Sequence, residues 1–309
     1  LNPTRVDHIV RVDSLEAIRT TILKAKREGK AVSIDGGRHA MGGQQFGADT
    51  VLIDTGQYKR VLSFDSNRGL VDVEAGIQWP ELVEYLLTVQ QGRSRQWGIV
   101  QKQTGADRLS IGGALAANVH GRGLSLKPLI EDVESFVLVD ADGNRRTCSR
   151  QENPELFRLA IGGYGLFGII AAVKLRLAPR TKMKRIVELI ELKELIPAVH
   201  RRIAEGSLYG DFQYSTDTNS TDFLWKGVFS YYRLVNAATP IPEGQKEFSV
   251  QDWNELIELA HGAKGEAFRR YADHYLSTSG QIYWSDTHQL STYLDDYHRT
   301  LDRKLKAVH

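Results

Sequence analysis

Several features that would mark particular classes of protein are scarce in this chain of 309 residues. Cysteine occurs once, as Cys148, which excludes an intramolecular disulfide framework and suits a reducing compartment, so we expect a cytoplasmic protein. No window approaches the run of about 20 apolar residues that a spanning helix needs, and no transmembrane segment is predicted. The 40 basic and 38 acidic residues are interspersed, so no nucleic-acid partner is indicated. No histidines or acids stand at zinc-ligand spacing, and no metal is expected.

Glycine is the residue present in excess, with 28 copies that lie mostly in the first half of the chain. The hydrophobic content of 41% and the charged content of 25% are those of a globular protein. Because glycine lets the backbone approach other groups closely, its clusters are the first places to look for a binding site.

The first half of the chain predicts short strands and helices joined by glycine-rich loops. Asp13-Ser14-Leu15-Glu16 has capping-box spacing, and apolar residues then recur every three or four positions until Gly29 ends the helix. In this half we expect strands at 31–34, 51–54, 61–75, 133–140, 145–148 and 169–177, and helices at 15–25, at 79–89 and from Pro154.

The composition changes near Pro179, where glycine clusters give way to aromatic residues. Here the pattern predicts a strand at 185–192, a helix to about residue 205, two strands on either side of a turn at 217–222, and a helix at 288–305. We therefore expect an α+β protein with two domains, residues 1–179 and residues 180–309.

The loop from Gly36 to Gln44 joins two short strands and carries four glycines around Arg38 and His39. Successive backbone N–H groups in such a loop form a concave nest that can hold a diphosphate without any side-chain charge. An ordinary glycine-rich turn is an equally good interpretation of this loop taken alone.

A second stretch of small residues runs from Thr104 to Gly123. Its small side chains would let it lie flat against a planar ring or a diphosphate. The alternative is a buried helix of small residues that packs on a sheet. Two such stretches in one domain together favour a bound dinucleotide.

The segment Gly163-Tyr164-Gly165-Leu166-Phe167-Gly168 matches the G-x-G-x-x-G pattern of dinucleotide-binding Rossmann folds. That site needs a strand before the loop and a helix after it, whereas here a helix precedes and a β-branched strand follows. We therefore interpret these glycines as a tight turn from helix to strand, and an NAD-binding protein is the weaker hypothesis.

In order and spacing, the three segments G-G-R-H-A-M-G-G-Q, S-I-G-G-A-L-A-A-N-V-H-G and G-G-Y-G-L-F-G-I-I resemble the vanillyl-alcohol-oxidase (PCMH-type) FAD-binding superfamily. The likeness covers roughly residues 6–179. It is strongest to decaprenylphosphoryl-ribose oxidases in the middle segments and to alditol and aldonolactone oxidases in the first.

The resemblance implies FAD as the cofactor and a PCMH-type FAD-binding domain of two subdomains, followed by an α+β substrate (cap) domain. That second domain looks incomplete at its C-terminal end. In the family the first loop wraps the diphosphate, the second stretch lines the flavin and ribose, and the backbone after the third segment contacts the cofactor. The matching positions are Gly36, Gly37, Arg38, His39, Ala40, Met41, Gly42, Gly43, Gln44, Gly105, Ser110, Gly112, Gly113, Ala117, Asn118, His120 and Ile170.

Two histidines at these positions carry more specific implications. His39 stands where covalent members of the family attach a histidine to the methyl group at C8 of the flavin, and the alternative is a histidine that only packs on the ring. Doubly attached members also place a cysteine where this chain has Gly105-Ala106-Asp107, so a second bond is not expected. His120 is the candidate for a catalytic side chain near the flavin, or else it is structural. The catalytic base is otherwise unidentified.

The implied function is the oxidation of an alcohol carbon in a polyol, sugar or aldonolactone, with hydride transfer to N5 of the flavin. The expected partners are a small alcohol or sugar substrate and an electron acceptor, oxygen or another. The alternative is an FAD-binding module, or a fragment, that does not itself catalyse the reaction.

Overall fold

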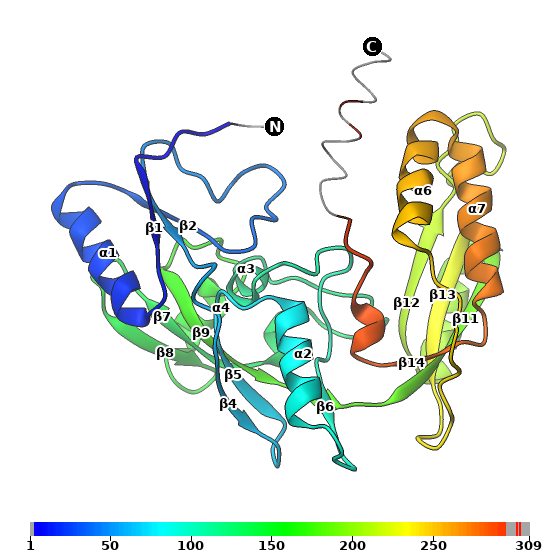
Figure 1. Ribbon diagram of the computed structural model, residues 1–309, viewed down its shortest axis with the longest axis horizontal. Helices are drawn as coiled ribbons and strands as arrows, with labels where there is room; N and C mark the ends of the chain where they lie inside the picture. The colour runs from blue at the N-terminus through cyan, green and yellow to red at the C-terminus, as the bar shows by residue number, and fades with distance from the viewer. Residues whose placement is uncertain (1–2, 295–300, 302, 304–309) are drawn as a thin grey trace. The chain divides into compact units, whose positions relative to one another are not determined.

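The computed structural model describes residues 3–294, 301 and 303 of the chain (Figure 1). It divides into two compact units. The first holds the chain up to Gly121 together with Lys127–Arg180, and the second holds Arg122–Leu126 together with the chain from Thr181 onward. The short excursion at residues 122–126 has no counterpart in the domain division expected from composition.

A three-stranded parallel sheet opens the first unit, with β3 in the centre and β1 and β2 at its edges. Its strands are β1 (His8–Arg11), β2 (Val32–Asp35) and β3 (Val51–Asp54). Helix α1 (Leu15–Arg27) connects β1 to β2, and the Ser14 hydroxyl caps it by accepting a hydrogen bond from the Ala17 amide at 3.2 Å. Because β2 and β3 are parallel neighbours, the loop that follows β2 starts at the carboxyl edge of this sheet.

A five-stranded antiparallel sheet in the order β4-β5-β9-β7-β8 forms the rest of this unit's framework. The strands are β4 (Val61–Asp65), β5 (Leu70–Glu74), β7 (Val133–Val139), β8 (Arg145–Ser149) and β9 (Ile169–Arg176). Around it lie α2 (Trp79–Val89), α3 (Ile111–Ala116), the 3-10 helix η1 (Leu129–Asp132), α4 (Pro154–Ala160), and the short pair β6 (Trp97–Gly98) and β10 (Ala178–Pro179). The β-region expected at 61–75 is a hairpin that turns at Gly69, where φ is +66°.

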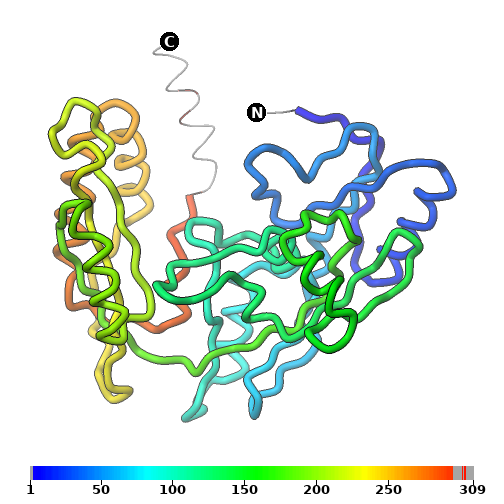
Figure 2. The backbone as a smooth tube through the Cα atoms, turned by 180° about the vertical axis from the view of Figure 1, so that it is seen from behind, coloured from blue at the N-terminus to red at the C-terminus, as the bar shows by residue number. Residues whose placement is uncertain are grey.

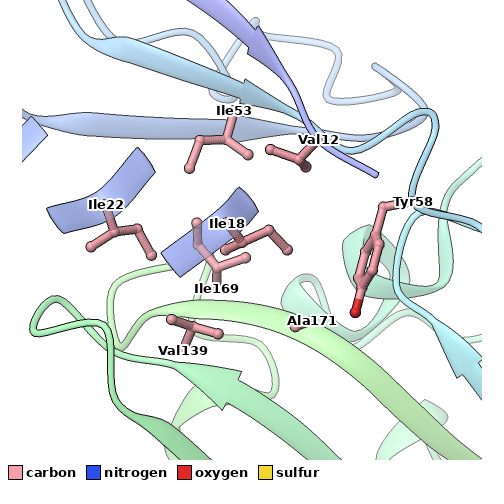
Figure 3. Close-up of a cluster of buried hydrophobic side chains, with 8 residues drawn as sticks. All are labelled: Val12, Ile18, Ile22, Ile53, Tyr58, Val139, Ile169 and Ala171. Atoms are coloured by element: carbon pink, nitrogen blue, oxygen red, sulfur yellow. The ribbon is translucent and has the colours of Figure 1, made fainter. Parts of the chain in front are cut away.

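The core of the first unit joins the two sheets through α1. Ile18 and Ile22 of α1 lie between Ile53 of the parallel sheet and Val139 and Ile169 of the antiparallel sheet (Figure 3). All five side chains are at least nine-tenths buried. Val32 and Ile34 of β2 also pack against this cluster, so the same core contacts β2 and the start of β9.

The second unit is built on a four-stranded antiparallel sheet in the order β12-β13-β11-β14. Its elements in chain order are β11 (Lys182–Glu191), α5 (Leu192–Ala204), β12 (Ser207–Tyr214), β13 (Lys226–Leu234), α6 (Val250–Gly262), α7 (Lys264–Ser277), β14 (Ile282–Trp284) and the 3-10 helix η2 (Thr287–Gln289).

Helices cover both faces of this sheet. Alternate residues of a strand point to opposite faces, so neighbouring residues of β13 pack against different helices. Phe229 and Tyr231 of β13 pack with Ala198 of α5 on one face, while Val228 packs with Ala272 of α7 on the other. The α6–α7 side is drawn in Figure 1, and the chain can be followed from behind in Figure 2. The expected strands on either side of the turn at 217–222 correspond to β12 and β13.

The segment Arg122–Leu126 extends the sheet of the second unit alongside β12. The Leu124 amide donates to the Leu208 carbonyl at 3.0 Å, and the Gly210 amide donates to the Arg122 carbonyl at 2.8 Å. The second glycine-rich stretch thus ends inside the second unit.

Two parts of the chain differ from the expectation. Helices α6 and α7 lie in a part of the chain for which the sequence pattern predicted no helix or strand. The helix expected at 288–305 is wrong at its start, since η2 ends at Gln289 and residues 290–294 are irregular. There the Gln289 amide group donates to the Ser285 carbonyl at 2.8 Å, which closes a turn instead of continuing a helix. Most of the later positions lie outside the described residues.

Among the described residues, no helix has both the length and the apolar character that crossing a membrane requires.

Candidate cofactor site

The first glycine-rich loop leaves the carboxyl end of β2 with a row of unused backbone donors. In the described part of the chain, the amides of residues 36–41 donate no hydrogen bond, whereas those of Gly42 and Gly43 are engaged within the loop. Gly36, Gly37 and His39 are half-buried and Arg38, Ala40 and Met41 are exposed, so these donors can be reached from outside. The arrangement is that of an anion-binding nest.

Arg38 holds the shape of this loop. Its φ of +57° is in the left-handed region, which a residue with a side chain seldom adopts without support. Its Nε lies 2.7 Å from Oδ2 of Asp35, and its Nη2 donates to Oδ2 of Asp54 at 3.3 Å. The guanidinium is therefore used to tie the loop to the ends of β2 and β3, while the amide of Arg38 remains available to a ligand.

Asp35, the last residue of β2, has a fully buried side chain. Burial raises the pKa of this carboxyl to about 6, although the neighbouring Arg38 pulls it down. The ion pair with Arg38 stabilises the charged form that a structural anchor for the loop requires.

The first loop rests directly on the second glycine-rich stretch. A Cβ on Gly36 would lie 2.2 Å from Oγ of Ser110, and a Cβ on Gly37 would lie 2.1 Å from the Arg108 carbonyl oxygen. No side chain fits at either position unless one of the two segments moves. The structure thus brings together the two stretches that the sequence singled out separately.

Ser110 begins the short helix α3, and its Oγ accepts a hydrogen bond from the Gly113 amide at 3.3 Å. Gly112 packs against Ala75, whose carbonyl accepts the Gly112 amide at 2.8 Å. A Cβ at Gly113 would meet nothing closer than Oγ of Ser110, at 3.1 Å. Gly112 is therefore needed for packing, and Gly113 has more free space beside it.

The third glycine segment lies on the end of α3. The Gly162 amide donates to the Leu115 carbonyl and the Tyr164 amide donates to the Ala116 carbonyl, both at 3.0 Å. As expected, α4 precedes this segment and β9 follows it, so it is a turn from helix to strand. Ile170 lies in β9 beyond Ala172, the last residue that pairs with β5.

A cavity of about 400 Å³ borders the third segment and β2. Its walls come from α1, β2, the end of β7 with the turn after it, and the third segment, and the lining residues include Ile22, Ser33, Ile34, Ala141 and Phe167. Lys26 and Lys30 also line the cavity, and each is ion-paired with a carboxylate, Asp142 and Asp7 respectively.

His39 is half-buried, and it faces charges supplied by the second stretch. Desolvation lowers the pKa of its imidazole below 6.5, the positive charge of Arg108 lowers it further, and the carboxylate of Asp107 opposes both effects. The ring is consequently neutral at neutral pH, which leaves one nitrogen with a free lone pair.

Two of the expected residues after α3 have different surroundings. The His120 ring is exposed, with Nδ1 3.2 Å from the Gly121 carbonyl oxygen. Asn118 adopts a left-handed conformation (φ +44°), and its Oδ1 accepts a hydrogen bond from the Ile130 amide at 3.1 Å. The Asn118 side chain therefore anchors η1, and its contribution to a cofactor site would come from its backbone.

Three buried polar residues near this site were missed at the level of sequence: Gln101, Lys102 and Asp107, all at most 6% exposed. The only signal was the polar run Gln101-Lys102-Gln103 placed directly after the apolar pair Ile99-Val100. Such a run is more often exposed, so its burial could not be inferred from the pattern.

The second unit contains a different kind of cluster, made of arginines and aromatic rings. Nε of Arg185 donates to the Tyr232 hydroxyl at 3.0 Å, and the guanidinium lies 4.5 Å from the centre of the Tyr283 ring. Arg122 donates to the His288 carbonyl at 2.9 Å, and the His288 ring lies between Tyr209 and Tyr232. Of the aromatic residues that marked the second half of the chain, Tyr209, Phe229, Tyr231 and Tyr232 are buried, whereas Trp225 is 60% exposed.

Comparison with known proteins identifies the first unit. The FAD binding domain family matches residues 6–149. L-gulonolactone oxidase from Bos taurus is 24% identical over 237 residues, which cover 72% of this chain and 52% of that protein. L-galactono-1,4-lactone dehydrogenase from Arabidopsis thaliana is 29% identical over 173 residues, which cover 55% of this chain and 26% of that protein. The chain therefore spans about half the length, or less, of the curated relatives it matches.

Solved structures show the same fold. The carbohydrate oxidase from Microdochium nivale superposes with a TM-score of 0.58 at 18% identity, over 90% of this chain and 54% of that one. This likeness confirms the expected α+β fold. The family match confirms the expectation of FAD as the cofactor.

Proposed function

We propose that this chain is an FAD-dependent oxidoreductase that oxidises an alcohol carbon of a polyol, sugar or aldonolactone, since residues 6–149 match the FAD binding domain family. The named relatives are sugar-lactone oxidases and dehydrogenases. Bound FAD would supply the acceptor for the hydride that leaves the substrate carbon. The reduced cofactor would then be reoxidised by oxygen or by another acceptor.

The observation that supports this proposal most strongly is the row of free amides at residues 36–41. A diphosphate has several oxygens to accept such donors, so the loop fits a dinucleotide better than a mononucleotide. The second stretch lies in contact with this loop, with small residues at Gly112 and Gly113. The chain itself thus provides the backbone cradle that FAD requires.

We place the adenosine half of FAD toward the third glycine segment. The 400 Å³ cavity there shares β2 with the nest, since Val32–Ile34 line it and the loop begins at Gly36. The third segment also carries exposed apolar side chains, with Tyr164 74% and Leu166 85% exposed. A planar base bound beside them would shield these side chains from water.

We propose that His39 bonds covalently to the methyl carbon at C8 of the flavin. Attachment requires an uncharged imidazole nitrogen, and the lowered pKa of His39 keeps the ring neutral at physiological pH. The residue lies within the row of amides at residues 36–41, two positions after Gly37, which contacts the Arg108 carbonyl oxygen. Ala40 after it departs from the serine usual in the resembled family, so the match at this motif is incomplete.

The group that removes the hydroxyl proton of the substrate is not assigned. His120 is the candidate in the first unit, because its ring is exposed and sits at the end of the stretch expected to line the flavin. Histidine is the side chain that most often transfers protons in enzyme active sites.

Anaerobic reduction tests the proposal directly. The purified chain should show the visible absorption bands of flavin, and these should bleach under argon when an aldonolactone or polyol is added. Bands that persist with every sugar, polyol and lactone tried would leave an FAD-binding module without this activity. A preparation that is colourless and takes up no added FAD would refute the cofactor site as well.

A further inference from the structure

Lys102 is a fully buried charged side chain beside the candidate cofactor site. The residue is 2% exposed and its side chain is fully buried. An ammonium group is strongly disfavoured in such a position unless it is paired and hydrogen-bonded. Lys102 lies in the extended segment that leads from β6 toward the second glycine-rich stretch, and the proposed function gives it no part.

Two partners of the Lys102 ammonium belong to the loop that follows it. Nζ forms an ion pair with the Asp107 carboxylate and donates a hydrogen bond to the Gln103 carbonyl at 2.7 Å. Asp107 is itself only 6% exposed. The side chain thus spans the loop from its first residue to Asp107, and it closes a turn that contains Gly105 in the left-handed conformation (φ +73°).

This loop is the surface on which the diphosphate nest rests. Arg108 follows Asp107 directly, and its carbonyl oxygen occupies the place that a Cβ on Gly37 would take. Asp107 and Arg108 are also the two charged groups that set the electrostatic surroundings of His39. A shift of residues 103–108 would therefore change both the shape of the nest and the environment of His39.

The adjacent side chain, Gln101, serves the opposite end of α3. Its amide group donates to the Lys127 carbonyl at 2.7 Å and to the Asp132 carboxylate at 3.1 Å, and its oxygen accepts the Gly121 amide at 3.3 Å. Gln101 thus holds the loop that carries His120, while Lys102 holds the loop below His39. The two adjacent side chains thus stabilise the two ends of the second glycine-rich stretch.

We propose that Lys102 is a positioning residue of the cofactor site: through Asp107 it holds residues 103–108 against the first loop, so that Gly37 and His39 keep the geometry that retains FAD. The inference rests on the proposed function, because it concerns the same FAD site. It adds a side chain that contacts no part of the cofactor and acts through the loop.

The test compares two pairs of buried or partly buried charges. Lys102→Met alone leaves the Asp107 carboxylate buried without its partner, so the double variant Lys102→Met/Asp107→Asn carries the test. The matched control is Arg202→Met/Glu188→Gln in the second unit, where Nη2 of Arg202 lies 2.7 Å from Oε1 of Glu188. For each full-length protein we would measure FAD per chain after extensive dialysis, the visible circular dichroism of bound flavin, and the melting temperature.

We expect the Lys102/Asp107 double variant to fold, to retain less than one-tenth of the wild-type FAD, and to show altered visible circular dichroism in the flavin that remains. The control should melt at a lower temperature but keep wild-type FAD content. Wild-type occupancy and dichroism in the Lys102/Asp107 variant would overturn the inference and leave the proposed function intact. Equal loss of FAD in both double variants would assign the effect to stability and also overturn it. A wild-type chain that binds no FAD would refute the proposed function itself.

Discussion

The polar sites of the two units are built differently, from backbone groups in the first unit and from side chains in the second. In the first unit the candidate site is made of backbone: free amides at residues 36–41, and glycines at 36 and 37 where neighbouring atoms leave no space for a Cβ. In the second unit the polar cluster is made of long side chains that hydrogen-bond to one another or to the backbone, among them Arg122, Arg185 and Tyr232. A backbone site depends on a few small residues close in sequence, whereas a side-chain cluster depends on strands that meet from distant parts of the chain.

This difference fits a division of labour in which the first unit holds a cofactor and the second unit helps to select a substrate. A diphosphate offers the same oxygens in every FAD, so a backbone nest can recognise it. Substrate selection needs particular side chains, and these can vary without disturbing the nest. The role of the second unit is a proposal that the following experiments can break.

The largest effect is expected from Gly37→Ala. Its Cβ would collide with the Arg108 carbonyl oxygen at 2.1 Å, so the loop must leave the second stretch. We expect the dissociation constant of FAD to rise on the order of a hundredfold, or ~2.8 kcal/mol, as measured by flavin titration of the apoprotein in a His39→Ala background that cannot form the proposed covalent bond.

Gly262→Ala is the matched control for that substitution. A Cβ at Gly262 would meet no atom within 4 Å, and the residue lies in the second unit at the end of α6. FAD binding should not change there. If Gly37→Ala bound FAD as tightly as this control, the first loop would not be the diphosphate site.

Removal of residues 180–309 separates the two units. The match to the FAD binding domain family covers residues 6–149, so we expect FAD uptake to remain measurable in equilibrium dialysis while substrate oxidation disappears. Arg122–Leu126 would lose the β12 backbone to which they are hydrogen-bonded, and limited proteolysis should cut there first. Complete loss of FAD binding by a folded 1–179 fragment would show that the cofactor site needs both units.

Much of the first unit could be predicted from the sequence because its signals are local. The helix at α1 follows from a capping serine and apolar spacing, and the loops follow from glycine clusters. The contact between Gly37 and Arg108 could not be predicted, since it joins segments about 70 positions apart in the sequence. The burial of Lys102 was hidden for the same reason: only the fold shows that Asp107 returns to meet it.

The second unit was harder to predict, and the reason is physical. Aromatic alternation correctly indicated strands at β12 and β13, but it carried no information about which helices cover them. Helices α6 and α7 have mixed surfaces, and of the residues of α6 only Leu256 is buried, so their apolar periodicity is weak.

A smaller effect is expected from His39→Ala. The backbone nest remains, so FAD should still bind, but it should be released by acid precipitation. Without the covalent bond we expect substrate oxidation to slow about tenfold, which corresponds to about 1.4 kcal/mol in activation free energy. Mass spectrometry of the wild-type peptide that contains His39 is the companion measurement. A peptide without the mass of FAD would exclude covalent attachment.

The last prediction concerns the stability of the fold instead of cofactor binding or turnover, and it involves Asp132, which accepts a hydrogen bond from Gln101. Burial raises the pKa of Asp132 from 3.8 to about 6. Between these values the folded state binds more protons than the unfolded state, so the stability contributed by this group is present below pH 4 and is lost as the pH rises through 6. Asp132→Asn should therefore match the wild type at pH 4 and exceed its free energy of unfolding by about 2 kcal/mol at pH 7. Parallel urea titrations would check this, and a constant difference between the two proteins across this range would contradict it.

The central claim is that the free amides of the first loop bind the diphosphate of FAD. The most direct measurement is nuclear magnetic resonance of the ¹⁵N-labelled His39→Ala chain, which cannot form the proposed covalent bond, purified without cofactor and titrated with FAD and, separately, with FMN. The account predicts that the amide signals of residues 36–41 shift strongly with FAD, to saturation at one FAD per chain, and respond weakly to FMN. Saturable FAD binding that leaves those amide signals unmoved would contradict it.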